Sequence, residues 1–206
     1  MGLPADSSLD RLIAATAAIN PNTIVINSTG FPTSMPWIDS VAAVIQAWFP
    51  GQEAGNSIAD VLLGAVNPSG KSLVTFPKSL KDTPAYSNLP GDLTTQKVTY
   101  AEGIYMGYRH FDRKPETILF PCRVGLSYTS FVVSKASLSG NNLQKEDSIT
   151  INANVTNNGS VAGREVIQVY VGSTASSSTI DRPEKQLAGF AKRRCFNRNK
   201  KRMSVW

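Results

Sequence analysis

Helical and strand-like segments alternate along the first 64 residues, and this alternation constrains the fold more than any other feature of the sequence. Apolar residues recur at helical spacing from Ser8 to Ile19, and an unbroken β-branched run follows from Thr23 to Asn27. An apolar stretch from Trp37 to Trp48 and a second helical pattern from Gln52 or Glu53 to Leu63 complete the series. Such an order predicts an α/β fold with a mainly parallel sheet, in which residues 23–27 are covered on both faces.

The pattern changes twice further along the chain. Residues 77–123 are rich in proline, glycine and polar residues and show no sustained periodicity, which indicates a connecting stretch. Three later segments, 131–138, 148–156 and 165–171, alternate apolar with polar residues and are separated by Asn- and Gly-rich turns. Short strands at this spacing predict an antiparallel β-sandwich, with a domain boundary near Ser130.

The positive charge is concentrated at the C-terminus. The chain has 206 residues and a net charge of +6, from 21 Lys and Arg against 15 Asp and Glu. Seven cations lie between residues 192 and 202, and without them 14 remain against 15 acids. A basic tail can bind phosphate backbones or anionic lipid. Because the rest of the chain is nearly neutral, we interpret the tail as a solvated or aberrant terminus and expect no nucleic-acid partner.

Two further features concern membranes and export. The longest apolar stretch, residues 41–49, is too short to cross a bilayer, so no membrane span is expected. The first residues, Met-Gly-Leu-Pro-Ala-Asp, lack the apolar core of a signal peptide.

Residues 65–72, Ala-Val-Asn-Pro-Ser-Gly-Lys-Ser, are similar to a phosphate-binding loop, but Ala65 stands where the first glycine is required. The context is also reversed, because a helical pattern precedes this segment and a strand-like run from Leu73 to Phe76 follows it. We interpret residues 68–70 as a turn after a helix and predict no nucleotide site.

His110 is the only histidine, so a Ser-His-Asp triad or a metal site with histidine ligands would have to be built around it. We expect a structural role for His110 between Arg109 and Phe111. Cys122 and Cys195 are too few for a disulfide framework and too far apart in sequence for a metal-binding pair.

Two carboxylates stand out. Glu53 opens a predicted helix, where a negative charge is stabilised by the helix dipole. Glu102 lies among tyrosines and near Arg109 and Arg113, so it either lines a sugar site or forms a buried ion pair with one of the arginines. We favour the ion pair.

Four stretches, taken in order along the chain, resemble the C-terminal half of glycoside hydrolase family three. Fungal β-glucosidases have the most similar sequence motifs. The four stretches are Pro21-Asn-Thr-Ile-Val-Ile26, residues 47–64 (Ala-Trp-Phe-Pro-Gly-Gln-Glu-Ala-Gly-Asn-Ser-Ile-Ala-Asp-Val-Leu-Leu-Gly), residues 67–77 (Asn-Pro-Ser-Gly-Lys-Ser-Leu-Val-Thr-Phe-Pro), and Tyr100-Ala-Glu-Gly-Ile-Tyr-Met-Gly-Tyr-Arg109 with Gly125-Leu-Ser-Tyr-Thr129. The resemblance covers about residues 3–192.

Members of this family have an N-terminal (β/α) barrel, an α/β sandwich and often a fibronectin type III-like domain. The resemblance therefore implies that residues 1–76 are part of the α/β sandwich and residues 77–130 a connecting segment. It further implies an incomplete fibronectin type III-like β-sandwich over residues 131–191, followed by an aberrant basic tail over residues 192–206. The localisation of the parent protein stays open, with secretion slightly favoured.

The resemblance also implies what the chain does not encode. The family's nucleophilic aspartate lies on the barrel, and its acid/base glutamate lies on a loop that would precede Met1. A retaining glycosidase needs both carboxyl groups, about 5 to 5.5 Å apart. We therefore assign no catalytic, cofactor-binding or metal-binding residue in this chain, and Glu53, Asp60 and Glu102 receive no catalytic role.

The expected function is that of a fragment, truncated at both ends, of a retaining, cofactor-free β-glucosidase. The parent would act on β-glucosides or cello-oligosaccharides, and this chain alone would be inactive. The alternative is a non-catalytic module that binds carbohydrate or protein.

Two departures from the family pattern carry expectations of their own. Arg123 replaces a glycine in the stretch Phe120-Pro-Cys-Arg-Val-Gly-Leu-Ser-Tyr128, and it would strain the turn if that glycine had a positive φ. After Lys192 the expected strand gives way to a run of cations, and we expect no later strands. A frameshift, a missed splice site or a truncated gene model would explain such an ending.

Overall fold

The computed structural model describes residues 8–142, 144, 146–173, 180–196 and, for the backbone, 200–205. The chain divides into two compact units, one of Met1–Ala59 with Ser72–Arg123 and the other of Asp60–Lys71 with Val124–Trp206. This division differs from the expected one. Residues 77–123, expected as a connecting segment, belong to the first unit, and residues 60–71 belong to the second.

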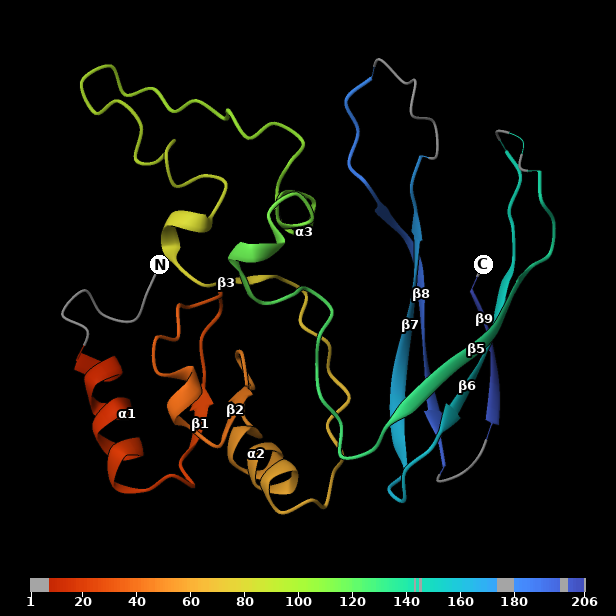
Figure 1. Cartoon of the computed structure of the whole chain (residues 1–206), viewed down its shortest axis with the longest axis horizontal. Helices are drawn as coiled ribbons and strands as arrows, with labels where there is room; N and C mark the ends of the chain where they lie inside the picture. The colour runs from red at the N-terminus through yellow and green to blue at the C-terminus, as the bar shows by residue number, and fades with distance from the viewer. Residues whose placement is uncertain (1–7, 143, 145, 174–179, 197–199, 206) are drawn as a thin grey trace. The chain divides into compact units, whose positions relative to one another are not determined.

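The start of the first unit follows the predicted alternation of helices and strands (Figure 1). Helix α1 (Ser8–Ile19) precedes β1 (Ile24–Asn27), and the short helix η1 (Ile38–Ser40) precedes β2 (Ala43–Gln46). The two strands pair in parallel, from Ile24 opposite Ala43 to Asn27 opposite Gln46. Helix α2 (Ala54–Leu62) follows. The predicted parallel pairing is therefore confirmed, within a small mixed fold of short sheets.

The expectation that residues 23–27 are covered on both faces is wrong for the described chain. Ile24 is 48% and Ile26 40% exposed. Within the described residues this sheet consists of β1 and β2, with Val25 packed against the core and Ile24 and Ile26 on the opposite face. An apolar run without alternation therefore does not require that both faces of the strand are buried, because here one face carries exposed apolar side chains.

The remainder of the first unit has little regular structure. Strand β3 (Phe76–Pro77) pairs antiparallel with β4 (Ile118–Phe120), and the short helices η2 (Leu80–Asp82), α3 (Tyr108–Phe111) and η3 (Pro115–Thr117) lie between them in sequence. Met35, Trp37 and Phe76 form its buried core, packed against Trp48 and Phe120 among others. The Trp37 indole donates a 2.8 Å hydrogen bond to the carboxylate of Asp10, which ties α1 to this core.

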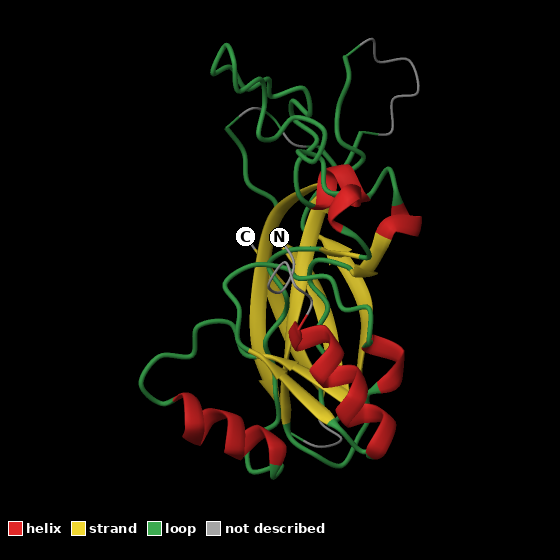
Figure 2. Ribbon diagram, turned by 90° about the vertical axis from the view of Figure 1, so that its left-hand side faces the viewer, coloured by secondary structure: helices red, strands yellow, loops and turns green. Residues whose placement is uncertain are grey.

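The second unit is an arrangement of antiparallel strands, drawn as the long yellow arrows in Figure 2. It contains β5 (Phe131–Leu138), β6 (Ile151–Asn157), β7 (Gly163–Val171), β8 (Gln186–Cys195) and β9 (Lys200–Val205). One sheet has the order β5-β6-β9 and the other pairs β7 with β8. Side chains from both sheets meet in a core around the fully buried Val155 and Cys195, which includes Phe131, Ile167 and Ala191.

The expectation that no strand continues beyond Lys192 is wrong. Strand β8 runs on to Cys195, and residues 200–205 form β9 against β6, from Ile151 opposite Val205 to Thr156 opposite Lys200. Alternate side chains of a strand point to opposite faces, so Lys192 and Arg194 lie on the face opposite to that of Cys195, which fills the core. A high density of Lys and Arg therefore does not by itself exclude a strand.

Among the residues that the structure describes, no helix is long and apolar enough to span a membrane.

Candidate functional site

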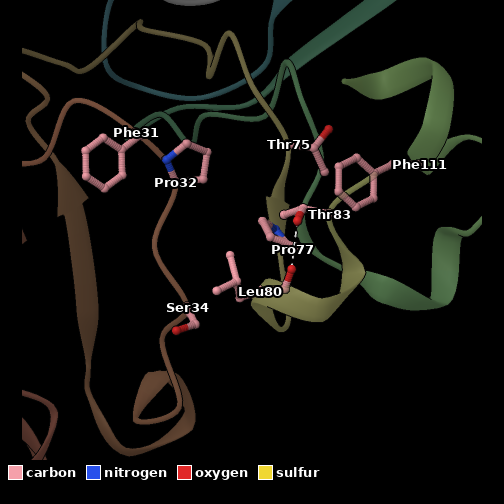
Figure 3. Close-up of a pocket in the computed structure, with 8 residues that line it drawn as sticks. All are labelled: Phe31, Pro32, Ser34, Thr75, Pro77, Leu80, Thr83 and Phe111. Atoms are coloured by element: carbon pink, nitrogen blue, oxygen red, sulfur yellow. Dashed lines mark hydrogen bonds between the residues drawn. The ribbon is translucent and has the colours of Figure 1, made fainter. Parts of the chain in front are cut away.

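The first unit contains an apolar pocket of about 320 Å³. Figure 3 shows Phe31 and Pro32 on one side of it and Thr75, Thr83 and Phe111 on the other. These residues come from the segment after β1, from the surroundings of β3 and η2, and from α3, so chain segments far apart in sequence build the walls. The complete lining is Phe31, Pro32, Ser34, Thr75, Pro77, Leu80, Thr83 and Phe111.

The chemistry of this pocket is limited to binding. Its lining contains no acidic, basic or histidine side chain, and the Thr83 hydroxyl is already used, since it donates to the Leu80 carbonyl at 2.7 Å. General acid or base catalysis requires a titratable group within hydrogen-bond reach of the reacting atoms. The pocket is therefore suited to an apolar group and has no residue that could transfer a proton.

Glu53 lies immediately before helix α2, as expected. Its backbone carbonyl accepts from the Ser57 amide at 2.9 Å, and its carboxylate accepts from the Asn56 side chain at 2.6 Å. Glu53 is exposed, so its carboxylate remains in water. Asp60 lies inside the same helix and is also exposed. Both residues thus have the surroundings of surface groups on a helix.

Glu102 does not form the expected ion pair with Arg109 or Arg113. Its carboxylate instead accepts a hydrogen bond of 2.7 Å from the Asn88 side chain, and the Arg113 guanidinium stacks over the Tyr105 ring, 3.4 Å from its centroid. The Glu102 carboxylate is therefore stabilised by the Asn88 amide, and the Arg113 cation by the face of the Tyr105 ring. The sequence placed the groups in one region but did not indicate their partners.

His110 connects two segments of the first unit. Its Nε2 atom lies 3.2 Å from the Asp82 carbonyl oxygen, and its ring packs edge-on against Phe111 at 5.1 Å between centroids. Because a carbonyl only accepts, Nε2 carries the proton in this contact. His110 therefore holds α3 next to η2, beside the pocket wall that Phe111 and Thr83 form.

The loop that is similar to a phosphate site has a structural role within the second unit. Residues 65–72 follow the end of α2 and are not followed directly by a helix, so they do not link a strand to a helix as a phosphate-binding loop does. The Asn67 side chain accepts from the Ser127 hydroxyl and the Tyr128 amide, each at 2.9 Å, and donates to the Ala162 carbonyl at 3.0 Å.

Lys71 completes this loop with a charged contact that the sequence did not reveal. Its ammonium lies 3.0 Å from a carboxylate oxygen of Glu165 and donates to the Gly125 carbonyl at 3.0 Å. The sequence did mark these residues, since Asn67, Lys71 and Gly125 all lie in stretches that resemble the family. The contact between residues far apart in sequence appears only in the fold.

Burial affects the protonation of one cysteine. Desolvation raises the pKa of the Cys122 thiol, a nearby Asp112 adds to this, and the Arg123 cation partly opposes it. The thiol sulfur lies 3.2 Å from the Leu73 carbonyl oxygen. Among the described residues, no group of three His, Cys, Asp or Glu side chains is placed to hold a metal ion.

The chain is similar to known β-glucosidases over nearly its whole length. The family model of the glycosyl hydrolase family 3 C-terminal domain matches residues 1–108. Beta-glucosidase B of Emericella nidulans is 50% identical over an alignment of 202 residues that covers 92% of this chain and 23% of that protein. Thermostable beta-glucosidase B of Acetivibrio thermocellus is 43% identical, over 93% of this chain and 25% of that protein.

Solved structures give the same result for the fold. A β-glucosidase from Streptomyces venezuelae in complex with D-glucose matches 96% of this chain and 25% of its own, with a TM-score of 0.87 and 36% identity. The β-glucosidase from Kluyveromyces marxianus matches 100% of this chain and 24% of its own, with a TM-score of 0.87 and 38% identity.

The chain spans about a quarter of the length of these relatives. The family model covers more than half of its 206 residues, and the resemblance seen in the sequence motifs is confirmed. This chain therefore belongs to glycosyl hydrolase family 3 and corresponds to the C-terminal region of its β-glucosidases.

Proposed function

We propose that this chain is the C-terminal portion of a β-glucosidase that hydrolyses terminal β-D-glucosyl residues of β-glucosides or cello-oligosaccharides with retention. One observation carries the proposal, namely the match over 92% of the chain, at 50% identity, to a fungal β-glucosidase. Retaining hydrolysis needs one carboxylate that attacks the anomeric carbon and one carboxylic acid that protonates the leaving oxygen. No cofactor is required for either step.

The part that these 206 residues play in such an enzyme is structural. The family's nucleophile and acid/base have no counterpart in this sequence by resemblance. Glu53 and Glu102 have other local partners, since Glu53 bonds Asn56 and Glu102 bonds Asn88. We therefore expect that the chain on its own does not hydrolyse β-glucosides.

The two units would then correspond to two parts of the parent enzyme. The parallel pair β1–β2, with the helices next to it in sequence, supports a part of the α/β sandwich over residues 1–76. The two antiparallel sheets around Val155 and Cys195 support a fibronectin type III-like domain that begins near residue 131. Strands β8 and β9 extend this second domain beyond the expected limit at residue 191.

A graft experiment tests the proposal. The corresponding quarter of the Emericella nidulans relative is replaced by the whole chain, and hydrolysis of an aryl β-glucoside is measured. We expect the grafted enzyme to retain activity and this chain alone to have none. Turnover by the isolated chain near that of the intact relative would contradict the missing carboxylates, and a folded but inactive graft would contradict the assignment.

A non-catalytic carbohydrate-binding module is the second candidate, and exposed tyrosines favour it. Tyr86 is 45% and Tyr100 77% exposed, and aromatic faces of this kind can pack against sugar rings. Calorimetric titration of the chain with cellobiose distinguishes the two candidates. Binding that is lost in Tyr100→Ala, together with inactivity of the grafted enzyme, would favour the module.

A further inference from the structure

The second unit contains a polar cavity of about 460 Å³ that the proposed function does not use. The turn after α2 forms one wall and the start of β7 the other, and Arg194 of β8 joins them. Two of the lining residues are arginines. The complete lining is Gly64, Ala65, Val66, Asn67, Ser69, Val161, Ala162, Gly163, Arg164 and Arg194.

The two arginines of the cavity are direct partners in the antiparallel ladder, where Arg164 of β7 lies opposite Arg194 of β8. Side chains at such positions share one face of the sheet, and their Cβ atoms lie roughly 4.5–5.5 Å apart. Like charges placed directly opposite each other destabilise a sheet. The pair therefore calls for a compensating negative charge.

The described part of the protein does not provide that charge. No carboxylate among the described residues lies within 4.0 Å of either guanidinium. Glu165, the nearest acid along β7, is engaged by the Lys71 ammonium at 3.0 Å and by the Val166 amide at 2.8 Å. The contact recorded for the Arg194 guanidinium is with the Phe196 ring, 5.1 Å from its centroid, which leaves the N–H groups of the guanidinium available.

The remaining polar groups of the cavity are suited to an anion. The Asn67 side chain accepts from Ser127 and Tyr128 and donates one of its two N–H groups to the Ala162 carbonyl, which fixes the wall. The Ser69 hydroxyl has no hydrogen-bond partner among the described residues and is only partly exposed. Two guanidinium forks and a hydroxyl therefore line one cavity, and all three can donate hydrogen bonds.

We propose that this cavity binds a small oxyanion through Arg164 and Arg194, with Ser69 as a further donor. A phosphate group is the ligand that this donor set fits best, because arginine forks bind phosphate oxygens in a bidentate manner. Its source is either free inorganic phosphate or a phosphate ester on a small sugar. The bound anion lies between the two like charges and removes their mutual repulsion.

Calorimetric titration of the 206-residue chain with sodium phosphate tests the proposal, against sodium chloride at matched ionic strength. We expect saturable binding of phosphate, together with a rise in Tm that chloride does not produce. Arg164→Gln and Arg194→Gln should each weaken phosphate binding about tenfold, the loss of one charged fork. Arg193→Gln is the matched control, since Arg193 is the preceding residue of β8, points to the other face and does not line the cavity.

These measurements distinguish a specific phosphate site from a general attraction between phosphate and a basic protein. Equal weakening by Arg193→Gln and Arg194→Gln, or absence of saturable binding, would overturn it. Should either glutamine variant fail to fold, the double variant Arg164→Lys with Arg194→Lys keeps the charge but removes the forks, and unchanged phosphate affinity there would overturn it as well. Titration with glucose 6-phosphate and with glucose identifies the source, because an ester ligand binds more tightly than inorganic phosphate whereas a free-ion site favours the inorganic form.

Discussion

Lys71 and Glu165 form an ion pair of 3.0 Å across 94 residues of sequence, and both side chains are largely buried, at 18% and 16% exposure. Lys71 ends the loop that follows α2, and Glu165 lies in β7. The Lys71 ammonium also donates to the Gly125 carbonyl, so one cation joins three segments of the second unit. The pair fastens the loop 64–71 to the sheet that carries Arg164.

Removal of one partner of this pair should destabilise the protein. Lys71→Met leaves the Glu165 carboxylate partly buried and without its cation, and Glu165→Gln leaves the Lys71 ammonium in the same position. We expect each to lower the free energy of unfolding by about 2 kcal/mol, between the values for exposed and fully buried pairs. Urea unfolding measures the effect, with Lys78→Met as an exposed control. Additive losses in the double variant would show that the two residues do not interact.

Asn67 is expected to be as important as the ion pair. Its side chain makes three hydrogen bonds, to Ser127, Tyr128 and Ala162, and Asn67→Ala leaves those partners without it. The predicted loss of unfolding free energy is about 2–3 kcal/mol. Asn56→Ala is the matched control, because Asn56 is exposed and bonds only the exposed Glu53 side chain, and it should cost less than about 0.5 kcal/mol. Equal effects of the two changes would contradict the assigned role of Asn67.

Much of the fold was predictable because it depends on local periodicity. The helix from Ser8 to Ile19 and the strand from Phe131 to Leu138 have the predicted bounds, since cap residues, turns and alternation are encoded in neighbouring positions. Strand β9 was missed because four of its six residues, 200–205, are cations or serine, which limits the apolar alternation to Met203 and Val205. Its position comes from pairing with β6, a long-range interaction that no local pattern reports.

The side-chain contacts were less predictable than the elements. The sequence placed Glu102 near two arginines, but a short peptide segment does not determine which of several polar neighbours a flexible carboxylate meets. Asn88, 14 residues earlier, is its partner. The conformation of Arg123, by contrast, could be anticipated. It stands where the family has a glycine, and a glycine at a turn often has a positive φ. Its φ of 80° is indeed in the left-handed region.

Arg123 should therefore carry backbone strain that a glycine would relieve. The residue also places its guanidinium over the Tyr108 ring at 4.9 Å, so a direct comparison with glycine would mix two effects. Arg123→Ala and Arg123→Gly both lose this contact, and they differ in their tolerance of the positive φ and in the backbone entropy of the unfolded chain. We expect the glycine variant to be more stable by about 1 kcal/mol in urea unfolding. An alanine variant of equal or greater stability would exclude strain at this turn.

The partly buried thiol of Cys122 should give the protein a pH dependence. Burial raises the pKa of Cys122 in the folded state, so the folded protein retains this proton at a pH where the unfolded chain has already lost it. Stability is then unaffected well below the ordinary thiol pKa and falls as pH rises through and above that value. The comparison of urea unfolding between pH 7 and pH 10 for the parent and Cys122→Ser isolates the effect, since the serine variant lacks the titrating thiol.

The reactivity of Cys122 provides an independent measurement of the same shift. In a Cys195→Ser background, reaction with a thiol reagent should be slow at pH 8 and accelerate only at higher pH, because the thiolate is the reactive form. A rate at pH 8 equal to that of a free cysteine peptide would contradict the raised pKa.

The last strand should be necessary for the integrity of the second unit. Strand β9 pairs with β6 along six residues, and β8 ends at Cys195, which is fully buried against Val155. Deletion of residues 193–206 therefore exposes the edge of β6 and opens the core, and unpaired strand edges promote association with other chains. We expect the truncated chain to aggregate in size-exclusion chromatography. The control combines Lys200→Thr, Lys201→Thr and Arg202→Thr in the full chain, which keeps strand-forming residues and removes three charges. A monomeric truncated chain, with loss of salt-dependent nucleic-acid binding as its only change, would instead show that residues 193–206 act as a basic tail.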